Sequence, residues 1–452
     1  MTSAIATLRS NFSPLRYPNF RLYLGGQAVS LIGTWLQVTA QGWLVWTLTG
    51  SEAASGIVTM LSTLPILLLG PWAGVWADRL DRRKILIGTQ AVAMMLAFIL
   101  AYLVQTRIAQ IWHVFPPWSQ PYNETAWGVQ ASAVQIWHVY LLSIFLGIVN
   151  TLDLPTQQTF LGDLTGMGDV RKAVNLNVTV LQISRLIGPA FAGFIIARLG
   201  VAPAFWLNGL SFLAVIISLI LVRSNQVRPV NPGKVNPLRE VGEALKFLRT
   251  QPRMQDLFIF STMVVFLFLS IILSQLPAVA DRLLGGDANT YSTLQMASGA
   301  GALIGVTFVA PLAQARRRVG VVLGLFTIWM GVWLLLFGLS RVPILSIICM
   351  FMGSLGPPVV IPMSLGLTQQ MSPPNMRARL ISLFTMISFG LQTVAVLLVG
   401  VIAERLGIST AIQLNALLLI AGAIFMLARR TELRRWVMEA AHVKPAIVEG
   451  HV

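Results

Sequence analysis

The sequence predicts an all-α integral membrane protein in which twelve transmembrane helices form two parallel six-helix bundles around a central cavity. Three observations lead to this fold class: the composition, a set of apolar runs of spanning length, and an internal repeat. Of the 452 residues, 56% are hydrophobic and 11% are charged, and the mean hydropathy is +0.74. About 25% of the residues of an average soluble protein are charged. The composition therefore excludes a soluble globular enzyme, a disordered chain and a disulfide scaffold.

The cysteine and histidine counts argue against a metal centre, and we expect no other cofactor. The single cysteine, Cys349, excludes an internal disulfide and a cysteine-based metal cluster, and four histidines leave little room for a metal centre. The N-terminal stretch is short of apolar residues and lacks a small-residue cleavage site after an apolar core, so we expect no cleavable signal peptide.

Apolar runs long enough to cross a bilayer, which takes about 20 mostly apolar residues, recur along the whole chain. Each run is expected to be a helix, because an open sheet cannot satisfy its backbone hydrogen bonds in lipid. The twelve runs lie at about 22–47, 53–77, 85–105, 138–160, 172–197, 204–222, 256–279, 291–313, 319–339, 344–367, 379–403 and 410–428.

The basic residues predict the orientation in the membrane. If both termini are cytoplasmic, 26 of the 32 Lys and Arg residues fall in cytoplasmic segments, five fall outside and Arg185 falls within a span. Cytoplasmic loops are the ones that carry an excess of Lys and Arg. We therefore expect a multi-pass protein of the cell (inner) membrane with both termini in the cytoplasm. The net charge of +16 is explained by these loops and does not indicate nucleic-acid binding.

An internal repeat predicts two homologous halves. G-F-I-I-A-R-L-G at 193–200 reappears as G-V-I-A-E-R-L-G at 400–407, and 12 of the 31 positions in 193–223 are identical at this offset of 207. Arg, Gly and Asn match in register, which argues against a chance similarity between apolar segments. Both copies begin on the same side of the membrane, so the repeat is parallel. Two parallel halves are typical of transporters whose substrate site lies between them.

The repeat and the composition divide the chain into four parts. Within the linker, P-L-R-E-V-G-E-A-L-K-F-L-R has the apolar spacing of a short amphipathic helix that lies on the membrane surface. The parts are an N-terminal bundle at 1–222 with an external loop at about 106–137, a cytoplasmic linker at 223–253, a C-terminal bundle at 254–430 and a cytoplasmic tail at 431–452.

The external loop contains a short duplication, Q-I-W-H-V, at 110–114 and 135–139. The duplicated histidines, His113 and His138, lie beside tryptophans. Two interpretations stay open: a metal site, or anchoring of the tryptophans at the membrane interface.

The sharpest motif follows the second run: G-V-W-A-D-R-L-D-R-R-K, from Gly74 to Lys84. It resembles the loop signature of the major facilitator superfamily, G-x-x-x-D-R-x-G-R-R-(K/R), with Asp81 in place of the second glycine. The resemblance implies that Asp78, Arg79 and Arg82 latch the two halves together on the cytoplasmic side, with Arg83 completing the motif. The positive-inside rule alone would explain the bases but not the glycine and the aspartate.

A second motif lies in the fifth run: S-R-L-I-G-P-A-F-A-G, from Ser184 to Gly193. The pair Gly188-Pro189 is expected to kink the helix, and small residues along one edge, Gly193 among them, are expected to allow close packing. The segment is similar to the G-P-x-x-G-G pattern of the superfamily's exporters. The N-terminal stretch and the fourth run also resemble the enterobactin-exporter-like branch, although Gln157 stands where that branch usually has an arginine.

Two charged residues lie within the predicted spans, and intramembrane charges usually face a partner or a water-filled cavity. Asp153 precedes Pro155 in the fourth run. The resemblance implies a gating role for it, through the loop arginines; a proton-carrying role and local capping are the alternatives. Arg185, in the fifth run, either contacts an anion or substrate in the cavity or pairs with Asp153 or a backbone carbonyl.

The first run carries a stripe of polar side chains instead of a deep carboxylate. Their spacing of three or four residues places them on one face of a helix. That face must contact protein or water, so the stripe either lines the central cavity or forms hydrogen bonds between helices. Its members are Gln27, Ser30, Thr34, Gln37 and Gln41.

These features predict a secondary active transporter that acts as a monomer. No nucleotide-binding motif G-x-x-x-x-G-K-(S/T) is present, so the chain is not by itself an ATP-driven pump. We expect export of a siderophore-like or drug-like molecule against proton entry. One alternative is a transporter of a lipid-related substrate such as a lysophospholipid, for which inward transport is also considered. A more remote alternative is a non-transporting receptor. No set of residues in the spans suggests an enzyme.

Overall fold

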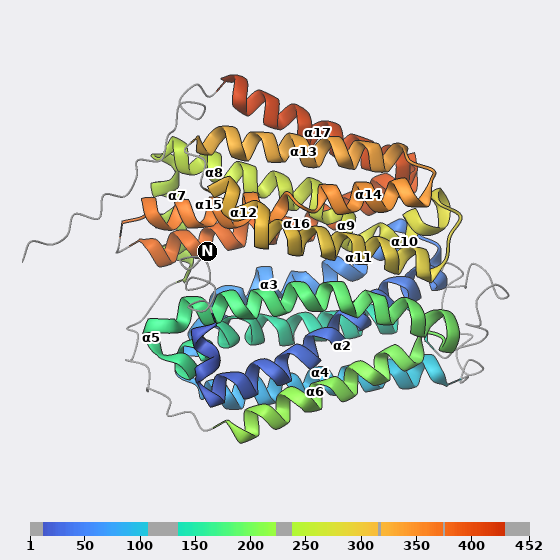
Figure 1. The fold of residues 1–452 in the computed structure, drawn as a ribbon, viewed down its shortest axis with the longest axis horizontal. Coiled ribbons are helices and arrows are strands. Elements are labelled where there is room, and N and C mark those ends of the chain that lie inside the picture. Colours follow the sequence, from blue (N-terminus) through green and yellow to red (C-terminus); the bar gives the residue numbers. More distant parts are fainter. Residues whose placement is uncertain (1–11, 107–133, 223–236, 315–317, 374–375, 430–452) are drawn as a thin grey trace, which may run out of the picture.

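The computed structural model describes residues 12–106, 134–222, 237–314, 318–373 and 376–429, without the side chains of 71, 73–79, 167, 237–238, 378 and 389. Every element in these ranges is a helix. The helices form two bundles that lie side by side, one built by the first half of the chain and one by the second (Figure 1).

The first bundle consists of a short η1 and five helices. The longest of these helices, α5, contains both the fourth and the fifth predicted runs. Its backbone leaves helical geometry at Gly166, where φ is 69°, a conformation that glycine adopts at little cost. The bounds are η1 (Ser13–Arg16), α2 (Pro18–Thr49), α3 (Glu52–Arg79), α4 (Arg82–Gln105), α5 (Ile136–Leu199) and α6 (Ala202–Leu221).

The second bundle contains broken helices. Pro277 and the pair Pro357-Pro358 each lie at the start of a new segment, because proline lacks the N–H that a continuing helix would need. The bounds are α8 (Pro252–Met263), η3 (Val264–Leu269), α9 (Ser270–Ser274), α10 (Leu276–Ala278), η4 (Val279–Leu283), α11 (Ala288–Ile304), η5 (Gly305–Val309), α12 (Ala310–Gln314), α13 (Val319–Leu339), α14 (Pro343–Gly353), α15 (Pro357–Met371), α16 (Arg377–Leu406) and α17 (Ile408–Arg429).

Eleven helical segments of the described chain are long and apolar enough to cross a membrane. They correspond to the second to twelfth predicted runs. The first run, 22–47, is helical as part of α2 but is not among the eleven. Its polar stripe lowers its hydropathy below that of an ordinary span. The protein is therefore a multi-pass, helical membrane protein.

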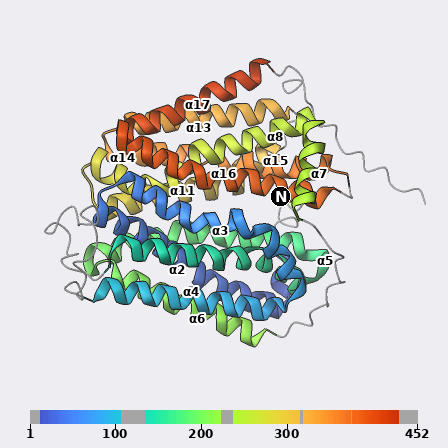
Figure 2. The ribbon, with the colours of Figure 1, turned by 180° about the vertical axis from the view of Figure 1, so that it is seen from behind.

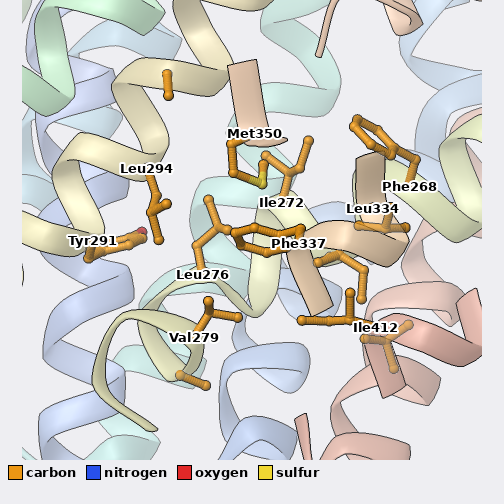
Figure 3. Close-up of a cluster of buried hydrophobic side chains, with 14 of the residues drawn as sticks. Phe268, Ile272, Leu276, Val279, Tyr291, Leu294, Leu334, Phe337, Met350 and Ile412 are labelled. Atoms are coloured by element: carbon orange, nitrogen blue, oxygen red, sulfur yellow. The ribbon is translucent and has the colours of Figure 1, made fainter. Parts of the chain in front are cut away.

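Glycines allow the helices of the second bundle to approach closely. Gly324, Gly331 and Gly338 recur every seven residues along α13, and a Cβ at any of them would lie within 3 Å of an α17 side chain. Small residues at interfaces are how helices pack in lipid, where apolar burial gives little driving force. Larger side chains fill the interior beside them: Phe268, Ile272 and Leu276 meet Leu334, Phe337 and Met350 (Figure 3).

The linker helix, α7 (Pro237–Arg249), lies against the second bundle. Its apolar residues Ala244 and Leu248 pack in a cluster with Met254, Phe258, Leu380 and Phe384. Arg379 of α16 bonds to Glu240 and Glu243, at 3.3 and 2.5 Å. The apolar face of this amphipathic helix thus packs against the second bundle.

The two bundles meet along two helix pairs, α3 with α16 and α5 with α11, and Figure 2 shows α3 facing the second bundle. A Cβ on Gly56 of α3 would lie 2.5 Å from the carbonyl oxygen of Val396, and Thr393 donates a hydrogen bond to Thr63 over 3.1 Å. We call the end of the molecule at which α2 meets α3 the Gly50 end, and the end at which α3 meets α4 the Arg82 end.

Candidate functional site

A cavity of about 180 Å³ lies at the contact between the two halves. Gln182 and Arg185 of α5 line it from the first half. Ser298 of α11 and Ser354, in the break between α14 and α15, line it from the second, together with apolar residues of η3, α9, α11 and α15. A cavity with convergent polar groups from two packed halves is the position at which transporters built from repeats hold their substrates.

Arg185 is the one charged residue among those that line this cavity. Its Nη2 lies 3.4 Å from Oγ of Ser298, and its guanidinium lies over the ring of Trp35 at 5.2 Å. Its Nε is buried and has no hydrogen-bond partner in the described part of the chain. The structure therefore places Arg185 at the cavity and on the second half, and Asp153 is not among its hydrogen-bond or ion-pair partners there.

The glycines of the 184–193 motif contact both halves. A Cβ on Gly188 would lie 2.5 Å from Cβ of Trp35 in α2, and one on Gly193 would lie 2.7 Å from Cβ of Ser292 in α11. Pro189 lies inside α5, and the residue at which the α5 backbone leaves helical dihedral angles is Gly166 instead. The motif thus holds α5 against α2 on one side and against the other half on the other side.

Asp153 lies at the centre of a buried cluster of neutral polar side chains. Thr89 donates a hydrogen bond to its Oδ1 over 2.6 Å, Gln90 donates to the same oxygen over 3.0 Å, and Gln157 donates to Oδ2 over 2.5 Å. Gln27 of α2 in turn donates to Gln157 over 3.3 Å. These contacts join α2, α4 and α5 around a carboxylate whose hydrogen-bond partners carry no charge.

The polar stripe of α2 forms hydrogen bonds with helices of its own half. Asn208 of α6 donates to Gln37 over 2.6 Å, and Gln41 donates to Ser143 of α5 over 3.0 Å. Thr34 donates to the carbonyl of Ser30 within α2, over 2.9 Å. Together with Gln27 these bonds favour the helix-packing interpretation of the stripe over the cavity-lining one.

Replacing Gln37 by leucine tests this interpretation. The substitution leaves the buried Nδ2 of Asn208 without its acceptor, so we expect a loss of about 1 kcal/mol in the free energy of unfolding. Substrate selectivity should stay unchanged. Thermal unfolding in detergent measures the first effect and a substrate panel the second; Val38→Leu, at an exposed position of the same helix, is the control. A changed substrate profile with unchanged stability would instead favour the interpretation that the stripe lines the cavity.

The loop motif is described in part. The side chains of Asp78 and Arg79 lie outside the described residues, and Gly74 is described only as part of the backbone of α3. Arg82 bonds through Nη1 to both carboxylate oxygens of Asp163 in α5, at 2.8 and 2.9 Å. Arg83 donates to the carbonyls of Leu219 and Ile220 at the C-terminal end of α6, where a positive charge complements the helix dipole. The carboxylate on α5 that meets the loop arginine is therefore Asp163, ten residues beyond Asp153.

We expect Arg82→Gln to reduce transport about tenfold while membrane abundance stays within about twofold. The pair is mostly buried and joins α4 to α5 within the first half, so removing Arg82 leaves the carboxylate of Asp163 without this cation at the Arg82 end. Arg171→Gln, an exposed arginine of α5, should transport normally. Transport rates normalised to protein in the membrane decide the outcome, and equal rates in both variants would contradict a latching role.

At the Gly50 end, charged and polar contacts join the two halves. Arg282 of η4 bonds to the carboxylate of Glu52 over 2.5 Å and to the carbonyl of Gly50 over 2.7 Å. Asp281 accepts a hydrogen bond from Nε1 of Trp46 over 3.0 Å, and the Arg282 guanidinium lies 5.0 Å from the Trp46 ring. Glu52 is fully buried. We call Trp46, Glu52, Asp281 and Arg282 the Gly50-end clasp.

A second contact lies beside the clasp. Glu404 of α16 accepts hydrogen bonds from the Ser51 hydroxyl over 2.7 Å and from the Ala53 backbone over 3.1 Å. Gln275 also donates a hydrogen bond to the backbone carbonyl of Glu52, over 3.4 Å. The hydrogen bonds between the halves at Thr63 and Arg185 lie nearer the middle of the molecule. The described polar contacts thus hold the halves together from the Gly50 end to the middle.

Sequence reasoning missed Asp163 and the clasp. Arg282 is one of the five Lys and Arg residues expected outside, and Glu52 and Asp281 lie just beyond the ends of predicted runs. A signal was present: opposite charges follow the first and seventh runs, which are corresponding helices of the two halves. The repeat predicted this correspondence but not that these ends touch.

Of the duplicated histidines, His138 is the one within the described residues. His113 falls outside the described residues. His138 accepts a hydrogen bond from the Gln135 backbone over 3.0 Å and stacks on Trp137 at 3.7 Å, at the N-terminal end of α5. The described contacts therefore make His138 part of a helix cap.

The family model described as "Transmembrane secretion effector" matches residues 9–116 and 126–449. Among curated proteins, the enterobactin exporter of Shigella flexneri is 24% identical over 94% of this chain and 95% of its own length. Macrolide efflux protein A of Streptococcus pyogenes is 23% identical over 90% and 96%. The staphyloferrin A transporter of Staphylococcus aureus is 23% identical over 67% and 68%.

Solved structures share the fold. A D-xylose–proton symporter aligns with a TM-score of 0.68 at 14% identity and covers 94% of this chain and 98% of its own. A bacterial homologue of the human lysosomal transporter Spinster, in an inward-facing and unoccupied conformation, aligns with a TM-score of 0.64 at 15% identity over 94% and 99%.

Proposed function

The chain belongs to the transmembrane secretion effector family of the major facilitator superfamily, and on that premise we propose that it exports a siderophore-like or drug-like organic molecule by alternating access. As a member it is a transporter of small molecules. The observation that carries the proposal is the cavity at the contact of the halves, lined by both of them, with the described polar contacts reaching from it to the Gly50 end.

The proposed topology has α2 as a twelfth span, which gives six helices in each half. α2 packs along α5 and α6 over its length, and its amides bond within the bundle, which supports a position inside the membrane despite its low hydropathy. With the termini in the cytoplasm, the Gly50 end is external. The clasp then closes the outside, and the conformation described is inward-facing.

Proton coupling is the proposed energy source, with Asp153 as the proton carrier. Burial favours the neutral form of a carboxylate, and the described hydrogen-bond partners of Asp153 include no cation that would hold it ionised. The relatives named for siderophore transport and for drug efflux support this exporter over uptake of a lipid-related substrate.

A comparison of metabolites tests the proposed function. Cells with and without the protein are grown alike, and small molecules in medium and cytoplasm are compared. We expect at least one organic compound to move from cells to medium only when the protein is present. The same compound should then accumulate in inside-out vesicles that carry the protein. Accumulation in right-side-out vesicles instead would reverse the proposed direction.

A further inference from the structure

We propose that the cavity between the halves is an anion site: Arg185, with Ser298 and Ser354, binds a carboxylate, phosphate or sulfonate group of the transported molecule. The inference rests on the proposed function and adds the chemical class of the substrate. It follows from the contacts of Arg185, the hydroxyl pair facing it and the remaining lining of the cavity.

The guanidinium of Arg185 has unused hydrogen-bonding capacity. Arginine carries five N–H donors in a planar fork, whereas the hydrogen bond described for Arg185 is the long one, 3.4 Å, to Ser298. Its Nε is buried without a partner in the described part of the chain. A cation removed from water is costly unless it is paired, and the face of Trp35 compensates only part of this cost. An anion in the cavity would supply the missing partner.

The two serines direct a further donor toward the same space. Ser354 donates its proton to Ser298 over 3.0 Å, and Arg185 also donates to Ser298. The oxygen of Ser298 thus accepts twice, which leaves its own proton available. A bound oxyanion could accept that proton together with the N–H groups of Arg185, since hydrogen bonds to ionised groups are the strong ones.

The rest of the lining suits an anionic group attached to an apolar body. No Asp or Glu is among the residues described as lining the cavity, and Leu269, Ile272 and Ile361 supply apolar walls. Its volume of about 180 Å³ equals the share of roughly six liquid waters. An anionic head and its first few carbons fit this space.

The site depends on contact between the halves. A Cβ on Gly299, next to Ser298, would lie 2.8 Å from the carbonyl oxygen of Arg185. This close approach of α5 and α11 is what places the guanidinium of one half beside the hydroxyls of the other. An anion bound here therefore bridges the halves and favours the conformation in which they touch.

Charged thiol reagents test the site without a known substrate. In full-length protein with Cys349→Ser, held in lipid nanodiscs, Ile361→Cys places one thiol in the cavity. Its thiolate attacks a methanethiosulfonate, forming a mixed disulfide and releasing methanesulfinate. The probes are the 2-sulfonatoethyl and the 2-(trimethylammonium)ethyl reagents, and the measured quantity is the ratio of their rates. Thr250→Cys, at an exposed position after α7, gives the reference ratio.

We expect the sulfonate reagent to be favoured at position 361 about tenfold over the reference, because a buried positive charge attracts one probe and repels the other. Arg185→Gln should abolish the preference, and Arg185→Lys should retain most of it. A ratio equal to the reference, a preference for the cation, or no modification at position 361 would overturn the inference.

The comparison of position 361 with position 250 decides the matter even if Arg185→Gln fails to fold. The labelling experiment does not measure transport, so failure of the anion-site inference can be told apart from failure of the proposed export function. An anion preference without export overturns the proposed function alone. Export of a neutral compound without an anion preference overturns the inference alone.

Discussion

Arg282→Gln is expected to open the Gly50 end and to reduce transport at least tenfold. The substitution leaves the carboxylate of Glu52 buried without a cation, and the second oxygen of that carboxylate, Oε2, already lacks a hydrogen-bond partner in the described part of the chain. Arg282 is itself partly exposed, so we expect the halves to lose about 1–2 kcal/mol of contact free energy rather than the full cost of breaking a buried pair. A two-state equilibrium then shifts roughly tenfold toward the state open at this end.

Spin labels at Leu199→Cys and Leu406→Cys, on the Cys349→Ser background, measure the opening by the distance between the two halves. Both leucines are exposed ends of helices at the Gly50 end, one in each half. Arg405→Gln, an exposed arginine at the same end, is the control and should leave the distance distribution unchanged. Glu52→Gln combined with Arg282→Gln should cost no more than Arg282→Gln alone, because the pair acts as a unit. Unchanged distances in Arg282→Gln would remove the clasp as a gate.

Asp153→Asn is expected to abolish transport driven by a proton gradient while leaving exchange of substrate across the membrane intact. The asparagine oxygen can still accept from Thr89 and Gln90, so the cluster keeps its packing but loses the group that takes up a proton. In proteoliposomes with an imposed pH gradient, we expect accumulation to fall at least tenfold. Exchange with equal substrate on both sides should stay within about twofold, because it needs conformational switching but no net proton movement.

Two other outcomes for Asp153→Asn separate the remaining interpretations. Equal loss of gradient-driven transport and exchange would assign Asp153 to switching between conformations, which is the gating role that the family resemblance implies. Accumulation that survives both the substitution and an uncoupler would rule out proton coupling. Thr89→Val is the control: it removes one hydrogen bond but keeps the carboxylate, so gradient dependence should persist.

Most of the fold could be predicted from the sequence because the formation of each helix in lipid depends mainly on its own segment of the chain. A spanning segment must satisfy its own backbone hydrogen bonds, so apolar length alone located eleven of the helical segments that can cross a membrane. The fourth and fifth runs both lie within α5, whose backbone leaves helical geometry between them, at Gly166. The run at 22–47 forms a helix, and its low hydropathy follows from the polar stripe that packing buries.

The candidate site could be predicted only as a set of polar residues in spans. Arg185 was identified because a charge within a span needs a partner, but Ser298 and Ser354 are unremarkable in the sequence, and they become site residues where α11 and the break before α15 meet α5. Asp153 was likewise identified, whereas its neutral partners on α4 were not. Periodicity gives the face of a helix on which a residue lies, but it does not say which helix covers that face.

The sequence by itself determined the membrane class, the helical segments and the family, since apolar length and sequence motifs are properties of short segments. Tertiary structure alone decided that Arg82 meets Asp163, that Gln37 meets Asn208 and that Glu52 meets Arg282. These partners lie 81, 171 and 230 residues apart. Their contacts exist because close helix packing brings polar groups together where water is excluded, and in that environment a buried polar group must find whichever partner the neighbouring helix presents.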